Sequence, residues 1–226
     1  MKLAVLFSGG KDSCYALLKA MDKEDVVCLI SMISNNKESY MFHTPNIEMT
    51  RLQAEAIGLP LIQKATEGNK EEELKELKEA IIEAKQMFKI EGIVTGAIES
   101  IYQSSRIQKI CDELALRCVN PLWKKEQQGL LKELVDQGFK VMISGVAAFP
   151  MGKEWLGRMI DDKVIKELVA LREKHKISPS GEGGELETTV LDAPFFKKSL
   201  EIIDAESVFE HNSGVFIIKK ARLMKK

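Results

Sequence analysis

The stretch that decides the fold lies near the N-terminus and reads Leu3-Ala4-Val5-Leu6-Phe7-Ser8-Gly9-Gly10-Lys11-Asp12-Ser13-Cys14-Tyr15-Ala16-Leu17-Leu18. It begins with an apolar run typical of a strand buried on both faces, and its paired glycines predict a tight turn. Asp12 or Ser13 is expected to cap the helix after this turn, because short polar side chains accept hydrogen bonds from the first amides of a helix. Strand, glycine loop and helix N-terminus together predict an anion site, since backbone N–H groups converge there and glycine lets phosphate oxygens approach.

Two common phosphate-binding motifs do not match this loop. A Walker A loop needs Ser or Thr directly after Gly-Lys, but Asp12 follows Lys11, and the glycine that should begin the motif is absent. The dinucleotide fingerprint fails here too, and at Gly181-Glu182-Gly183-Gly184 its last glycine would fall on Leu186. The pattern that does match is Ser8-Gly9-Gly10-Lys11-Asp12-Ser13, which resembles the SGGxDS pyrophosphate loop of the ATP pyrophosphatase, or PP-loop, superfamily. The alternative is an ordinary capped turn in an α/β sheet.

The resemblance to PP-loop enzymes implies a chemistry and a set of cofactors. These enzymes cut ATP between its α and β phosphates and transfer AMP to a carbonyl or carboxyl oxygen, after which a nitrogen or sulfur nucleophile displaces AMP. All six loop residues would bind ATP, with the serine hydroxyls and the amides holding pyrophosphate and Lys11 offsetting its charge. Asp12 would be the metal ligand that orients Mg²⁺. Lys11 and Asp12 are therefore catalytic candidates, and ATP and Mg²⁺ are the expected cofactors.

Composition and charge narrow the class of protein further. The 226 residues are 45% hydrophobic, which is enough for one large domain or two modest ones. With 33 Lys and Arg against 34 Asp and Glu, the chain has no overall basic field, so a nucleic-acid partner is not expected. No stretch approaches the roughly 20 apolar residues of a membrane span, and we expect a cytoplasmic protein. The four cysteines form no C-x-x-C pair, which indicates reduced core thiols rather than a zinc site.

Strands and helices alternate through the first half of the chain. Apolar runs predict strands at residues 26–33, 59–63, 90–96 and 117–119, and helical periodicity predicts helices at 46–57, 68–89 and 104–114. This alternation is typical of a doubly wound, mostly parallel, Rossmann-like sheet. Ligands collect at the carboxyl ends of parallel strands, so Ser31 and Met32 are expected beside the adenine and Gly96 in a second wall of the site. His43 is a weaker candidate, because a lone histidine near a helix start is more often structural.

The second half of the chain has a different pattern. A β-rich run at residues 139–149 precedes a helix at 161–175 and a hairpin of strands 200–210 and 215–220 turned by residues 211–214. We therefore expect an ATP-binding domain at residues 1–137 and a smaller, substrate-binding α+β domain at residues 138–226. An exposed hairpin edge can pair with another chain, which leaves a homo-oligomer open.

An acidic, glycine-rich segment at residues 176–189 is the second informative stretch. Glu182, Glu185 and Glu187 would repel one another unless a cation, a proton or an ammonium group lay between them, and the alternative is a solvated loop. A closer resemblance favours a functional segment over a solvated loop. Several segments of the chain are similar, in order, to motifs of the diphthine–ammonia ligase (diphthamide synthase) family within the PP-loop superfamily. They are SGGKDS at residues 8–13, G-A-I-x-S-x-Y-Q-x-x-R at 96–106, Pro121-Leu122-Trp123, and G-E-G-G-E-[FYL]-E-[TS] at 181–188.

This resemblance implies the last step of diphthamide synthesis. The family adenylates the carboxylate of diphthine, a modified histidine on translation elongation factor 2, and ammonium displaces AMP from the acyl-adenylate to give diphthamide, AMP and pyrophosphate. The implied fold is of the adenine nucleotide alpha hydrolase type. Free ammonium fits better than a fused glutaminase, since none of the four cysteines lies in a Gly-x-Cys context. Glu182, Glu185 and Glu187 would gather ammonium or Mg²⁺, and one of these carboxylates would accept the proton that ammonium loses.

The resemblance also implies contacts with the substrate. Diphthine carries a trimethylammonium group, for which the aromatic candidates are Tyr102, Trp123 and Trp155. The other substrate-binding candidates come from the matched motifs and are Gln103, Arg106, Gly183, Gly184 and Thr188. Elongation factor 2 and ammonium are thus the expected partners.

Other functions share the first motif. A PP-loop enzyme that modifies tRNA would generally show a catalytic cysteine pair, metal-type cysteines or an added RNA-binding domain, and the basic residues 219–226 are more simply a solvated tail. A non-catalytic module would bind ATP or AMP without turnover, so accumulation of AMP and pyrophosphate with an acceptor distinguishes it from an enzyme. Amidation of a small molecule would leave the acidic segment and the turn at 96–106 unexplained.

Overall fold

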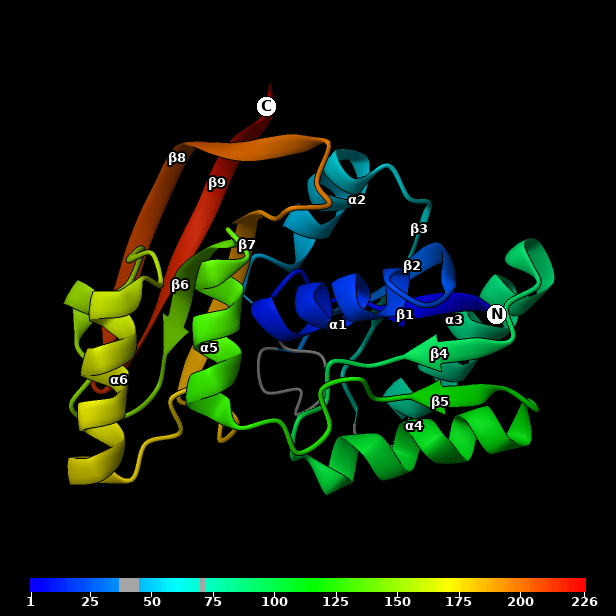
Figure 1. Ribbon diagram of the computed structural model, residues 1–226, viewed down its shortest axis with the longest axis horizontal. Coiled ribbons are helices and arrows are strands. Elements are labelled where there is room, and N and C mark those ends of the chain that lie inside the picture. The colour runs from blue at the N-terminus through cyan, green and yellow to red at the C-terminus, as the bar shows by residue number, and fades with distance from the viewer. Residues whose placement is uncertain (37–44, 70–71) are drawn as a thin grey trace.

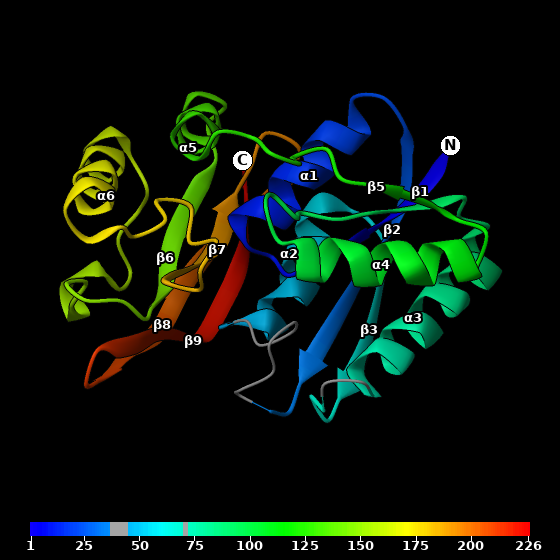
Figure 2. The same ribbon diagram turned by 90° about the horizontal axis from the view of Figure 1, so that it is seen from below.

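Two sheets organise the chain, which the computed structural model describes at residues 1–36, 45–69 and 72–226. The first sheet has the strand order β3-β2-β1-β4-β5 and the second the order β7-β6-β9-β8 (Figure 1). Seen from below, the two sheets and their helices form two adjoining parts of the molecule (Figure 2). The predicted class, an α/β protein with a doubly wound parallel sheet and a smaller second part, is confirmed. The weak candidate His43 lies outside the described residues.

All neighbouring strands of the first sheet are parallel. Its elements are β1 (Lys2–Leu6), α1 (Lys11–Met21), β2 (Asp25–Ser34), α2 (Thr50–Ile57), β3 (Leu61–Thr66), α3 (Glu72–Phe88), β4 (Gly92–Val94), α4 (Ile101–Glu113) and β5 (Arg117–Val119). The chain adds β2 and β3 on one side of β1 and then crosses to the other side for β4 and β5. The loop after β1 and the turn after β4 therefore meet at the carboxyl edge of the sheet, where the strand order reverses and ligands commonly bind.

Helices cover both faces of the parallel sheet. α3 and α4 pack with Ile30 and Ile93 on one face, and α1 and α2 pack with Leu3 and Val5 on the other. The second of these cores continues into α5, β6 and β7, so one apolar cluster joins the two parts of the chain. The division into domains at residue 137 stays a prediction.

The second part of the chain contains an antiparallel sheet and two helices packed against each other. Its elements are α5 (Gln127–Asp136), β6 (Lys140–Val146), α6 (Asp162–His175), β7 (Leu186–Asp192), β8 (Lys198–Glu210) and β9 (Ser213–Lys225), and short 3₁₀ turns lie at Ile47–Met49 and Lys153–Trp155. Our reading of the sequence predicts neither α5 nor β7. α5 carries Gly129 in its first turn and is capped by Glu126, whose carboxylate accepts hydrogen bonds from two amides. β7 directly follows the glycine-rich segment, so the sequence pattern does not mark the residue at which the strand begins.

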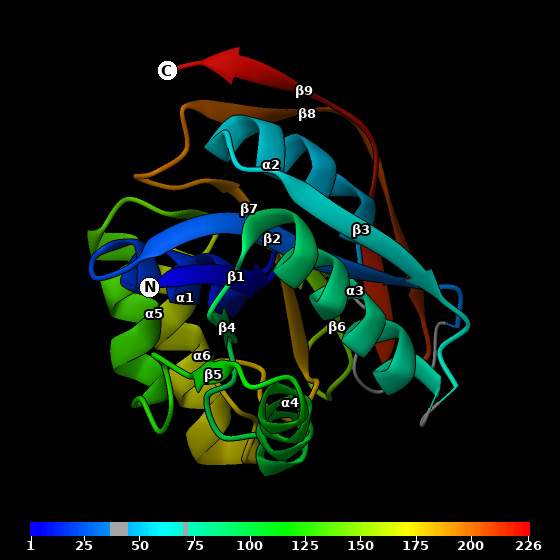
Figure 3. The same cartoon turned by 90° about the vertical axis from the view of Figure 1, so that its right-hand side faces the viewer.

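The hairpin of β8 and β9 extends over α2 (Figures 1 and 3). It is longer than the sequence predicts, because the basic C-terminal residues continue β9, and Lys225 lies opposite Lys198. Lys219 and Arg222 in β9 form ion pairs with acidic residues of β8. Residues 219–225 are therefore part of a strand and not a free tail, although most of their side chains are exposed to solvent as predicted. β8 is an edge strand, and its pairing with a second copy stays a prediction.

The cysteines are free thiols. Cys14, Cys28 and Cys111 are buried, as expected of core residues. Burial raises the pKa of the Cys28 thiol to about 12, so this thiol stays protonated and unreactive at neutral pH. Among the helices of the described residues, none has both the length and the apolar character needed to cross a membrane.

Candidate functional site

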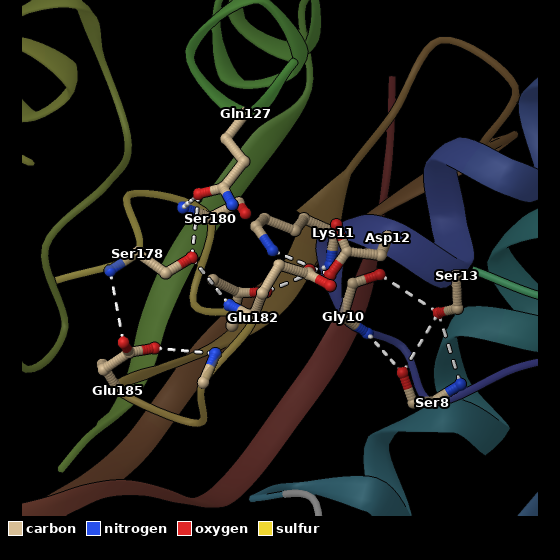
Figure 4. A network of polar contacts seen from close by, with 12 residues as sticks. Ser8, Gly10, Lys11, Asp12, Ser13, Gln127, Ser178, Ser180, Glu182 and Glu185 are labelled. Atoms are coloured by element: carbon tan, nitrogen blue, oxygen red, sulfur yellow. Dashed lines mark hydrogen bonds and ion pairs between the residues drawn. The ribbon is translucent and has the colours of Figure 1, made fainter. Parts of the chain in front are cut away.

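The loop between β1 and α1 closes on itself through its two serines (Figure 4). The Ser13 hydroxyl donates to the Gly10 carbonyl at 3.1 Å and accepts from the Ser8 amide at 3.3 Å, and the two serine hydroxyls are 3.2 Å apart. α1 begins at Lys11 with Gly10 as its N-cap and without a capping side chain. The prediction that Asp12 or Ser13 caps this helix is wrong, because both lie inside its first turn. The first amides of α1 therefore face a loop shaped by hydroxyl groups, which suits an anionic ligand.

Strand β7 and helix α2 hold this loop from outside. The Gly9 carbonyl accepts hydrogen bonds from the Val190 amide and from Gln53 Nε2, each at 2.9 Å. Gln53 Nε2 also donates to the Val190 carbonyl at 2.8 Å, and the Lys11 amide donates to Thr188 Oγ1 at 3.1 Å. Our reading of the sequence includes Thr188 as a substrate contact but misses Gln53 and Val190, which belong to none of the matched motifs. The anion loop and the strand that carries Glu187 are thus fastened together.

Two glycines allow these close approaches. A Cβ atom on Gly10 would lie 3.1 Å from the Thr188 carbonyl oxygen of β7. A Cβ atom on Gly96, in the turn after β4, would lie 2.9 Å from the carbonyl carbon of Asp12 and from the Ser13 amide nitrogen. Gly96 therefore lets the second wall of the site pack directly against the start of α1.

Two of the predicted glutamates face the same cavity as the anion loop. Glu182 and Glu187 line it together with Lys11 and Asp12, which form an ion pair at 2.7 Å. Burial raises the pKa of Glu182 to about 7, with the Asp12 charge adding to the shift and Lys11 opposing it. Burial likewise raises the pKa of Glu187 to about 7, again against the opposing charge of Lys11. Carboxyl groups with such pKa values can exchange protons near neutral pH.

Glu185 lies differently from the other two glutamates. Its carboxylate accepts hydrogen bonds from the Ser178 amide at 3.2 Å and from the Gly183 amide at 2.9 Å (Figure 4). It is not among the described residues that line the cavity. Glu185 thus braces the acidic segment, and the three glutamates do not form one cluster.

The N-terminus of α5 holds the same segment in place. The Ser178 hydroxyl donates to Gln127 Oε1 at 2.8 Å and accepts from the Glu182 amide at 2.9 Å (Figure 4). Gln127 therefore positions Glu182 through one intervening serine. Sequence reasoning misses this contact because it misses the helix that presents Gln127.

The cavity has a volume of about 580 Å³ and lies where the two parts of the chain meet. Its apolar lining comes from β1, β2, α3 and α4 and from the turn after β4, and consists chiefly of Leu6, Ile30, Met32, Leu77, Ala97 and Ile107. The predicted site residues that line it are Ser8, Gly10, Lys11, Asp12, Ser13, Met32, Gly96, Gln103, Glu182, Gly183, Gly184, Glu187 and Thr188. An apolar lining next to a phosphate-type loop is what a nucleotide requires of its binding site.

The remaining predicted residues lie elsewhere among the described residues. Gly9, Ser31, Tyr102, Arg106 and Trp123 do not contribute to the described lining. The Ser31 hydroxyl instead donates to the Phe7 carbonyl at 2.5 Å and so joins β2 to the end of β1. Met32 therefore lies in the lining, and the predicted contact between Ser31 and the adenine stays a prediction.

Two of the three aromatic candidates already stack on arginines. The Arg106 guanidinium lies 3.5 Å from the centre of the Tyr102 ring, and the Arg158 guanidinium lies 4.6 Å from the centre of the Trp155 ring. Trp155 is buried and is not part of the described lining of the cavity. The geometry therefore favours carboxylates over these rings as the groups that meet a cationic substrate.

Asp12 fits the role of a ligand for Mg²⁺. Its Oδ1 atom is buried and makes no hydrogen bond to the described part of the chain, while Oδ2 pairs with Lys11. No group of three or more His, Cys, Asp or Glu residues gathers as a ready metal cage among residues 1–36, 45–69 and 72–226. Mg²⁺ commonly uses one or two carboxylates and completes its shell with phosphate oxygens and water. A single aspartate beside a phosphate loop matches that donor set.

A doubly wound parallel sheet with an SGGKDS loop at its switch point defines a nucleotide-binding α/β protein of the PP-loop type. Family comparison agrees: the model of the diphthamide synthase N-terminal domain matches residues 1–118, and that of the diphthamide synthase C-terminal domain matches residues 126–224. The chain belongs to the diphthine–ammonia ligase family.

Individual relatives carry the same name. The diphthine–ammonia ligase of Homo sapiens is 33% identical, over 96% of this chain and 88% of its own length. That of Schizosaccharomyces pombe is 34% identical over 95% of this chain, which spans only 38% of the yeast protein. Among solved structures, a predicted subunit of tRNA methyltransferase from Methanocaldococcus jannaschii aligns with a TM-score of 0.45 at 17% identity, over 86% of this chain and 98% of that one. A U34-tRNA thiolase from Methanococcus maripaludis aligns with a TM-score of 0.38 at 14% identity, over 82% and 70%.

Proposed function

We propose that this chain amidates diphthine on translation elongation factor 2 with ammonium, using ATP and passing through an acyl-adenylate. The products are diphthamide, AMP and pyrophosphate. The observation that carries the proposal is that the SGGKDS loop and two carboxyl groups with pKa values of about 7 line one cavity. An adenylation site and a proton acceptor are the two functions that the reaction needs within reach of each other.

The first half of the reaction uses the loop and the apolar lining. The α1 N-terminus and the hydroxyls of Ser8 and Ser13 would hold the pyrophosphate of ATP, and Lys11 would offset its negative charge. The adenine would lie against the apolar lining that includes Met32. Mg²⁺, held by Asp12 Oδ1, would screen the phosphate charge when bound. A carboxylate oxygen of diphthine then attacks the α-phosphorus, and pyrophosphate leaves.

The second half of the reaction uses the acidic residues. An ionised Glu182 or Glu187 attracts the ammonium cation and takes one of its protons, which leaves ammonia as the nucleophile. Ammonia attacks the acyl carbon, the nitrogen passes a second proton to the departing AMP phosphate, the bond from that carbon to the AMP oxygen breaks, and the amide remains. The pKa values near 7 favour this role for both residues, because a base works best when its pKa lies near the working pH. Glu185 would act indirectly by bracing the segment that carries Glu182.

The test is a reaction with Mg-ATP, ammonium and a diphthine-bearing elongation factor, in which AMP release and the acceptor mass are followed together. We expect one AMP for each carboxylate converted to amide. Asp12→Ala should abolish both signals, whereas the matched control Asp22→Ala, at the exposed C-terminal end of α1, should leave both unchanged. If the wild-type protein binds ATP but leaves the acceptor unchanged, the proposed function is wrong, and tRNA is the next acceptor to test. If nucleotide binds but no acceptor yields AMP, a non-catalytic module becomes the better explanation.

A further inference from the structure

Ser180 is a buried serine in the wall of the cavity, just before the GEGGE motif. The residue is 1% exposed, and its hydroxyl makes no hydrogen bond to the described part of the chain. Its backbone amide donates to Gln127 Oε1 at 3.4 Å. Figure 4 shows Ser180 near Gln127, on the chain segment that leads to Glu182. Sequence reasoning does not single it out, because it lies outside every matched motif.

The other hydroxyl side chains of the cavity already have partners. Among the described residues that line it, the hydroxyl-bearing side chains besides Ser180 are Ser8, Ser13, Thr95, Ser100 and Thr188. Ser8 and Ser13 bond to each other, and Thr95 donates to Asn120. Ser100 and Thr188 accept hydrogen bonds from backbone amides. Ser180 is thus the one hydroxyl of this described lining without a bond.

A buried hydroxyl without a partner costs the free protein roughly 1–3 kcal/mol, so its presence in a site wall points to a ligand that supplies the partner. The chemistry of the cavity indicates which ligand group this is. Asp12, Glu182 and Glu187 already offer acceptor oxygens, which suit ammonium and Mg²⁺. The carboxylate of the acceptor, in contrast, enters among these negative charges and needs hydrogen-bond donors. A serine hydroxyl can donate without adding charge.

We propose that Ser180 is a substrate-binding residue whose hydroxyl donates to one carboxyl oxygen of the acceptor; this inference rests on the proposed function. The acceptor carboxylate has two oxygens. One attacks the α-phosphorus of ATP and leaves later with AMP, while the other remains as the carbonyl oxygen of the acyl-adenylate and then of the amide. Ser180 bonds the second oxygen throughout, including when ammonia adds and negative charge develops on it. The hydroxyl keeps its own proton. The nitrogen loses two protons, of which the first goes to a glutamate and the second to the departing AMP phosphate.

The variant that tests this inference is Ser180→Ala, with Ser144→Ala as a matched control. Ser144 is 0% exposed and also has a hydroxyl without a hydrogen bond to the described residues, but it does not belong to the described lining of the cavity. We expect Ser180→Ala to lower kcat/KM for the diphthine-bearing acceptor roughly 10- to 100-fold, the effect of losing a hydrogen bond to a charged group. The Kd for ATP should not rise and the midpoint of urea unfolding should not fall, since alanine removes an unpaired polar group. Ser144→Ala should match the wild type in kcat/KM.

The outcomes separate this inference from the proposed function. If the wild type amidates the acceptor and Ser180→Ala does so with an unchanged kcat/KM, Ser180 is not a substrate contact and the inference is overturned. It is also overturned if Ser180→Ala weakens ATP binding as much as acceptor turnover, because the serine would then support the loop instead. If the wild type itself leaves the acceptor unchanged, it is the proposed function that fails.

Discussion

Replacing Glu187 by glutamine is expected to stabilise the folded chain at pH 8 while it removes a candidate base. The pKa of Glu187 is about 7 in the folded protein, chiefly because of burial, against an ordinary value of 4.5. Between these two values the folded state binds more protons than the unfolded state, so the free energy of unfolding falls as the pH rises from 4.5 to 7 and then levels off. Glutamine does not titrate, so a chain with glutamine at this position does not lose this part of its stability as the pH rises.

The magnitude follows from the two pKa values. One unit of pKa corresponds to about 1.36 kcal/mol. The raised pKa of Glu187 therefore lowers the free energy of unfolding by about 3 kcal/mol at pH 8 and by less than about 1 kcal/mol at pH 5. The gain in stability of Glu187→Gln over the wild type should therefore be larger at pH 8 than at pH 5 by roughly 2–3 kcal/mol. Any effect of the substitution that does not depend on pH cancels in this comparison.

Urea unfolding followed by the fluorescence of the two tryptophans measures both differences. Glu210→Gln, on the exposed end of β8, is a control that should show the same stability change at both pH values. An equal effect of Glu187→Gln at pH 5 and pH 8 would refute the raised pKa of Glu187. The same pKa predicts that amidation by the wild type accelerates as the pH rises through about 7, because the carboxylate must be ionised to accept a proton.

Three further substitutions test how the site is held together. Gln53→Ala should destabilise the chain by about 2 kcal/mol in urea unfolding, since it removes both hydrogen bonds that Gln53 Nε2 donates, one of them to the Gly9 carbonyl; an unchanged midpoint would contradict that role. Gly96→Ala should weaken ATP binding at least tenfold in calorimetry, because the added Cβ would lie 2.9 Å from the Ser13 amide nitrogen. If the variant bound ATP as tightly as the wild type, the turn would have to relax without cost. Glu185→Gln should raise the KM for the acceptor but keep the pH dependence of the rate, whereas loss of that pH dependence would make Glu185 the base.

The amino-acid sequence by itself determined the class of fold and the position of the nucleotide loop. Alternating strand and helix patterns are local. They predict the five-stranded parallel sheet because the hydrophobic pattern of each buried strand and each amphipathic helix can be recognised within about ten residues. The SGGKDS loop is equally local. The sequence was least informative where a local signal was weak, as in α5, which starts with a glycine in its first turn, and in β7, which follows the acidic glycine segment directly.

Only the tertiary structure decided which members of the acidic segment share a cavity. Spacing in the sequence treats the three glutamates alike, yet β7 carries Glu187 to the anion loop while Glu185 turns back onto two backbone amides. The bonds of Gln53 to Gly9 and Val190 join segments that lie far apart in the chain, and no local pattern encodes such a contact. The unpaired hydroxyl of Ser180 is visible only once its surroundings are packed. Burial and hydrogen bonding belong to the folded environment, and that environment converts ordinary glutamates and serines into groups that can carry the reaction.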